Sequence, residues 1–173
     1  MNAEDDLTSA AGSLWHPVPT FSRPARGAAD RLGALWREID NRLSLPDPQC
    51  RACGRCCDFR EARHTLFAAR AELDFCLDWA RRHLPLRPAE AARRVAEGLC
   101  PFWEGGLCTV RSVRPVGCRV YFCSRERTTE RDELAVWAHR RLRDISAELG
   151  QPWWYGPALT YLGTNIPLLK VPC

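Results

Sequence analysis

Cysteines are the residues in this chain most able to do chemistry, and most of them fall into two runs. Two cysteines separated by two residues can turn both sulfurs toward one ion, at metal–sulfur distances of about 2.3 Å. Gly54 inside the first run lets the backbone turn where a side chain would obstruct it. We therefore predict one folded-together metal or cluster site, formed by eight of the ten cysteines: Cys50, Cys53, Cys56, Cys57, Cys100, Cys108, Cys118 and Cys123.

The spacing leaves the identity of the metal open. Cys50, Cys53 and Cys56 follow each other at equal steps, as in the local part of a [4Fe–4S] ligand set, and Cys100-Pro101 fits the distant fourth ligand. An alternative interpretation is zinc: eight thiols are the number needed for two tetrahedral four-thiolate sites, with Cys56 and Cys57 facing different ions. A disulfide framework is the third interpretation, and a cytosolic setting argues against it.

Arginines near the two runs are candidates for balancing the charge of the site. Four thiolates around a metal leave net negative charge, and burying it requires hydrogen-bond donors and counter-charges. Solvated loop arginines are the plain alternative. Pro115 stiffens the turn that we expect to deliver Cys118. The arginines close enough in sequence are Arg51, Arg55, Arg111, Arg114 and Arg119.

Other reactive side chains are left out of the predicted ligand set. Cys76 falls on the apolar side of an expected helix, where a thiol is typically a small buried hydrophobe. His64, His83 and His139 are isolated from one another in the sequence, so we assign no catalytic residue. A Cys–His nucleophilic pair would form in space rather than in sequence, and it stays open as an alternative.

The combined pattern resembles a known family. Cys50-x-x-Cys53-x-x-Cys56-Cys57, followed by Cys100-Pro101, Cys108, Arg114-Pro115-x-x-Cys118-Arg119 and Cys123, is similar to the CxxCxxCC family of zinc- or iron-chelating proteins, also called the YkgJ-type cysteine cluster family. The resemblance implies a metal or iron–sulfur site held by these cysteines. A related cysteine module occurs in flagellin lysine N-methylases, but no glycine-rich nucleotide loop is visible here.

The elements that must position the cysteines are expected to be helices. Apolar residues recur at helical spacing over 28–43, 71–83 and a long segment from Thr128 to 149, and Pro88 begins a shorter helix that ends at Glu97. Strand signals are weak. We predict a small, mainly α single domain of about four helices with irregular cysteine-rich loops. Residues 1–24 form an extended or partly disordered arm, and 25–173 form the metal-binding domain, with its cysteine core at 50–123.

Composition limits the classes of partner. The net charge of +4 comes almost entirely from arginines interleaved with 21 acidic residues, which argues against nucleic-acid binding. No stretch approaches the ~20 apolar residues of a membrane span. The N-terminus, Met1 to Asp6, is acidic and lacks the apolar run of a secretory signal, so we expect a cytoplasmic protein.

These observations predict a metal-binding protein. Zinc or iron, the latter as a [4Fe–4S] cluster, would be held by the two cysteine runs in a structural, metal-handling or electron-transfer role. The aromatic tail around Trp153, Trp154, Tyr155 and Tyr161 offers a docking surface for a protein partner. The alternative is an enzyme that uses the metal or iron–sulfur centre for redox or group-transfer chemistry.

Overall fold

Helices dominate the structure, a computed structural model that describes residues 17–43, 54–120 and 129–169. It confirms the prediction of a small, mainly α single domain. In these ranges the helices are α1 (Ala28–Leu43), α2 (Phe59–Ala62), α3 (Arg70–His83), α4 (Pro88–Ala96), α5 (Val116–Val120), α6 (Thr129–Glu148) and α7 (Ala158–Asn165). The strands are β1 (Phe67–Ala69), β2 (Trp103–Glu104), β3 (Leu107–Cys108) and β4 (Tyr155–Pro157).

The four longest helices match the predicted ones, three of them expected from apolar periodicity and α4 from Pro88 at its start. On α1, Leu32, Leu35, Trp36 and Ile39 are all buried, as their spacing indicates. α4 begins at Pro88 and is followed by Gly98 with a φ of +75°, a conformation that favours glycine. The Thr128 cap proposed for α6 lies outside the described residues. The short helices α2, α5 and α7 were not predicted, because none is long enough to establish a period.

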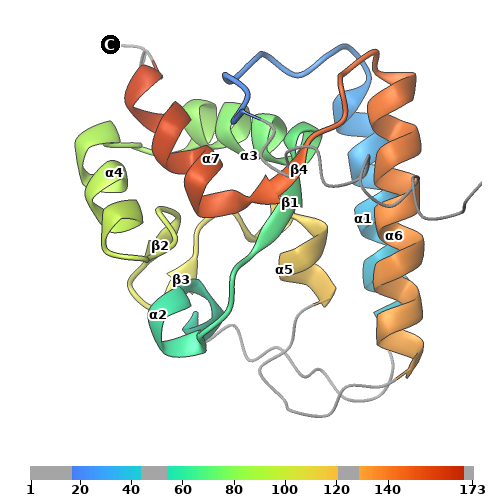
Figure 1. Ribbon diagram of the computed structural model, residues 1–173, viewed down its shortest axis with the longest axis horizontal. Coiled ribbons are helices and arrows are strands. Elements are labelled where there is room, and N and C mark those ends of the chain that lie inside the picture. The colour runs from blue at the N-terminus through green and yellow to red at the C-terminus, as the bar shows by residue number, and fades with distance from the viewer. Residues whose placement is uncertain (1–16, 44–53, 121–128, 170–173) are drawn as a thin grey trace, which may run out of the picture.

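The elements are arranged in two groups that meet at the centre of the molecule (Figure 1). α1 and α6 pack side by side along one edge, and α4 packs against α7 at the other. Between them, β1 and β4 form an antiparallel ribbon, with Ala68 opposite Gly156. The ribbon joins chain segments almost ninety residues apart, so local sequence signals were unable to reveal it. Within the described ranges, no helix combines the length and apolarity that a membrane crossing requires.

The described part of the predicted arm, residues 17–24, contains no helix or strand, and polar contacts fix it to the core. Ser22 donates to the buried carboxylate of Asp74 through its backbone N–H at 3.1 Å and its hydroxyl at 3.0 Å. Phe21 N donates to Oδ1 of Asn165 at 2.6 Å. Arg70 donates to the carbonyl oxygen of Thr20 at 3.0 Å. Residues 17–24 therefore belong to the folded unit.

Candidate metal centre

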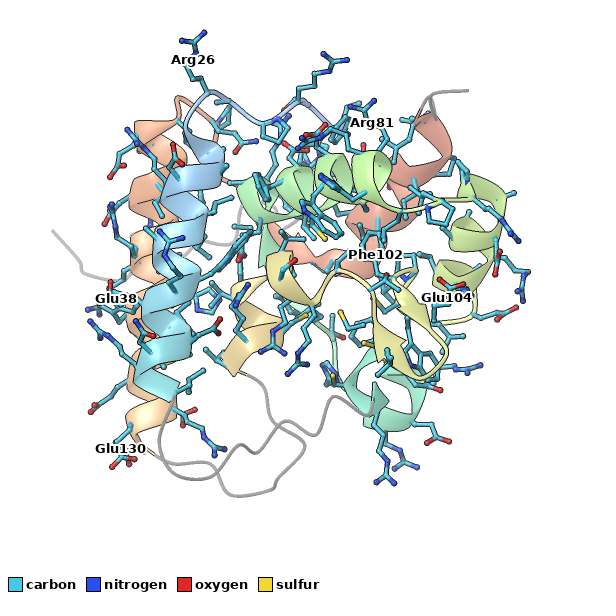
Figure 2. The ribbon with its side chains drawn as sticks, turned by 180° about the vertical axis from the view of Figure 1, so that it is seen from behind. Arg26, Glu38, Arg81, Phe102, Glu104 and Glu130 are labelled. Carbon is cyan, nitrogen blue, oxygen red and sulfur yellow. The ribbon has the colours of Figure 1, made fainter. Side chains whose placement is uncertain are left out.

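Six cysteines line a single cavity in the middle of the molecule. Figure 2 shows sulfur atoms gathered between α5 and the β2–β3 hairpin. The cavity has a volume of about 60 Å³, several times the roughly 10–15 Å³ that one water molecule needs. Apart from the thiols, its walls are mainly apolar side chains. The cysteines at its walls are Cys56, Cys57, Cys76, Cys100, Cys108 and Cys118.

A backbone hydrogen bond joins the two cysteine runs. The N–H of Cys100 donates to the carbonyl oxygen of Cys57 at 2.8 Å, beside an isolated antiparallel bridge between Asp58 and Leu99. The first run approaches through a tight 3₁₀ turn, in which Cys57 N donates to Gly54 O at 2.8 Å. These contacts explain how residues more than forty positions apart present their thiols to the same cavity.

Gly54 makes this approach sterically feasible. Its φ of +69° lies in the left-handed region, where an L side chain is strained. A Cβ at this position would overlap the indole of Trp103 and come within 2.6 Å of the carbonyl oxygen of Gly106. The turn that carries Cys56 and Cys57 therefore packs directly against the β2–β3 hairpin, which carries Cys108.

A buried carboxylate and a glycine position α5, which carries Cys118. Oε1 of Glu72 accepts a hydrogen bond from Val116 N, the first residue of α5, at 2.6 Å. A Cβ on Gly117 would lie only 2.8 Å from Cδ1 of Leu66, next to β1. Glycine therefore permits the close packing of α5 against β1, and Cys118 reaches the cavity. The predicted stiff turn at Pro115 precedes this helix directly.

Three of the cavity thiols, those of Cys56, Cys100 and Cys108, contact the thiol of Cys57. Contacts with the sulfurs of Cys100, Cys108 and Cys56, together with burial, raise the pKa of Cys57 strongly. The hydrogen bond from Cys57 lowers the pKa of Cys56 to about 6, although burial opposes this change. The same kind of contact lowers the pKa of Cys108 to about 7. Each of the four sulfurs is thus close to at least one other.

The two remaining thiols, Cys118 and Cys76, lie at the wall of the same cavity. Burial, and then the charges of Cys100 and Cys108, raise the pKa of both Cys118 and Cys76. Cys118 belongs to the predicted set. Cys76 was excluded as a small hydrophobe, and it is indeed buried, with 1% of its surface exposed. The structure nevertheless places it at the cavity wall; no signal in the sequence distinguished these two environments.

Two of the predicted counter-charges lie at the cavity. Arg114 and Arg111 both line it, and their charges contribute to the low pKa of Cys56. Arg119 has a different role: its buried guanidinium donates to Asp40, at 2.6 Å, and to backbone carbonyl oxygens. Arg55 is exposed. The fifth predicted arginine, Arg51, lies outside the described residues.

Of the three histidines among the described residues, one lies at the cavity and two lie elsewhere. His64 lines the cavity, and its Nε2 lies 3.4 Å from the carbonyl oxygen of Cys56. Burial lowers the pKa of His64, which favours the neutral imidazole. His83 contacts Trp79 O on its own helix, and His139 contacts the hydroxyl of Tyr155. Isolation in sequence therefore concealed the proximity of His64 to the thiols.

The described side chains are neighbours, but they are not arranged as coordinated ligands. In ranges 17–43, 54–120 and 129–169, no group of three or more Cys, His, Asp or Glu residues is placed so that it could hold a metal ion. The six cavity cysteines are all free thiols. Three predicted ligands, Cys50, Cys53 and Cys123, lie outside the described residues. The proposed convergence is thus visible for five of the eight predicted cysteines.

Comparisons with known proteins provide no relative from which to transfer a function. No family model, curated protein or solved structure matches the chain.

Proposed function

We propose that this protein binds zinc or iron through a thiolate centre formed by the two cysteine runs. The observation that carries the proposal is the gathering of five run cysteines at one cavity, although they come from separate segments of the chain. The full proposed set also includes Cys50, Cys53 and Cys123, with iron held as ions or as a [4Fe–4S] cluster.

The chemistry of the donor set fits a soft or borderline metal ion. Thiolates are the ligands that zinc and iron–sulfur clusters prefer. Four thiols in contact cannot all ionise without a cation, because their negative charges repel one another in a medium of low dielectric constant. A bound metal would supply that positive charge. Arg111 and Arg114 at the cavity wall would balance the charge that remains.

The cavity itself favours a second candidate function, in which the centre takes part in a reaction. A structural zinc site is closed by four protein ligands, whereas a reactive site keeps a position open. Here the His64 imidazole, which burial favours in its neutral form, lies on the same cavity wall as the thiols and would supply a base or an exchangeable ligand. We include redox or group-transfer chemistry at the centre as this second candidate. Either function requires reduced thiols, so a cytoplasmic location forms part of the proposal.

The test is elemental analysis combined with absorption spectroscopy of full-length protein purified without oxygen. We expect stoichiometric zinc in a colourless protein, or iron and sulfide with the broad visible absorption of a cluster. Cys100→Ser should lower the metal content at least tenfold, because it removes a thiol in contact with Cys57. Cys173→Ser is the matched control, since Cys173 lies outside both runs.

Two outcomes would contradict the proposal. The first is wild-type protein that contains neither metal and takes up none when it is reconstituted with zinc, or with iron and sulfide. The second is equal metal content in Cys100→Ser, Cys173→Ser and wild type.

A further inference from the structure

We propose that Cys76 is an additional thiolate ligand of the metal centre, beyond the eight cysteines of the two runs. The inference rests on the proposed function and deepens it. The side chain of Cys76 lines the same cavity as those of Cys56, Cys57, Cys100 and Cys108. It reaches the cavity from α3.

Cys76 is placed like a member of the predicted set. Cys76 lines the cavity together with Cys100, Cys108 and Cys118 of the second run, although it comes from a different helix, α3.

The neighbours of Cys76 on α3 separate the cavity from the core. Leu73, one turn before Cys76, also lines the cavity. Leu77 and Ala80 are equally buried, yet they pack in the hydrophobic core and are not part of the cavity wall. Cys76 thus lies at the boundary, where its sulfur borders both the core and the thiols.

α3 is also a rigid support for a ligand. Its first turn is fixed by Glu72, whose carboxylate binds backbone N–H groups of Ala69 and Val116. Its middle is fixed by Asp74, which accepts hydrogen bonds from Ser22, Arg70, Gln151 and Tyr161. A ligand on an anchored helix is held more precisely than one on a loop.

The proposed step exchanges a proton for a metal ion. A free thiol with an ordinary pKa near 8.5 carries its proton at pH 7, and the thiolate is the form that binds the metal. When Cys76 ligates, its S–H bond is lost, a metal–sulfur bond forms and one proton passes to the solvent. No oxidant or reductant is involved. The predicted ligand class is a divalent ion such as Zn²⁺, Fe²⁺ or the probe Co²⁺.

The experiment titrates Co²⁺ into full-length protein under anaerobic conditions and records two signals. One is the charge-transfer absorption between thiolate and cobalt, and the other is the number of protons released into weakly buffered solution. We expect Cys76→Ala and Cys76→Ser to release one proton fewer per protein than wild type at saturation and to show weaker charge-transfer absorption. Cys76→Ser keeps the size of the side chain, so it separates loss of a ligand from loss of packing.

Leu77→Val is the matched control for packing, because it deletes one heavy atom from the adjacent buried residue, as Cys76→Ala does. It should release as many protons as wild type. Unchanged proton release and absorption in Cys76→Ser would overturn the inference, and so would an equal loss in Leu77→Val. Wild-type protein that binds no cobalt, zinc or iron would instead overturn the proposed function, so the two failures are distinguishable.

Discussion

The buried carboxyl group of Glu72 should make the stability of the fold depend on pH. Its side chain is fully buried at the junction of α3, β1 and α5. Burial raises the pKa of Glu72 from 4.5 to about 7, although hydrogen bonds from Val116 N and Ala69 N and the charge of Arg119 oppose this change. The carboxyl is therefore held neutral at a pH where an exposed glutamate is charged.

The direction and size of the effect follow from linkage between proton binding and folding. Because the pKa of Glu72 is higher in the folded than in the unfolded state, its contribution to stability is fully present below pH 4.5 and is lost as pH rises through about 7. Each pKa unit corresponds to about 1.4 kcal/mol, so the change in the pKa of Glu72 from 4.5 to about 7 corresponds to a fall of about 3 kcal/mol in the free energy of unfolding as the pH rises.

The assay is urea unfolding of wild type and Glu72→Gln from pH 4.5 to 8, at the same metal loading. Metal binding, His64 and the cysteines also change stability with pH, but they do so in both proteins and cancel in the difference. We expect the free energy of unfolding of wild type, relative to Glu72→Gln, to fall by about 3 kcal/mol across this range.

A matched control is Glu130→Gln, which removes one carboxyl from the exposed first turn of α6. Its stability relative to wild type should vary far less over the same range. If the difference in free energy of unfolding between wild type and Glu72→Gln stays constant with pH, the reasoning about Glu72 is wrong.

Two further predictions concern the scaffold and the turn at the thiols. Asp74→Ala should lower the free energy of unfolding by about 3 kcal/mol in urea melts, because it leaves buried donors without an acceptor. The control is Asp144→Ala, which removes an exposed carboxylate. If Asp74→Ala lowers the free energy of unfolding no more than Asp144→Ala does, this prediction is wrong. Gly54→Ala should reduce bound metal at least tenfold in elemental analysis, since the added Cβ would overlap Trp103. Gly150→Ala, with φ +62° and open space around it, should leave the metal content unchanged.

Long-range contacts explain most of what sequence reasoning missed. α5 is five residues long, and its start is fixed by Glu72, more than forty residues earlier in the chain. β1 pairs with β4, almost ninety residues later in the chain, and strand signals in the sequence are weak. Segments this short contain too few residues for an apolar period, so tertiary contacts determine their conformation.

The sequence by itself determined the long helices and the two groups of cysteines. Apolar spacing specifies which face of α1, α3 and α6 is buried, and the spacing of cysteines is itself a local property of the chain. Only the tertiary structure decided which thiols share a cavity. It brought Cys76 and His64 to the same walls as Cys57, and it turned Arg119 away toward Asp40. The physical reason is that helical period depends on neighbours along the chain, whereas a site depends on packing between segments far apart in sequence.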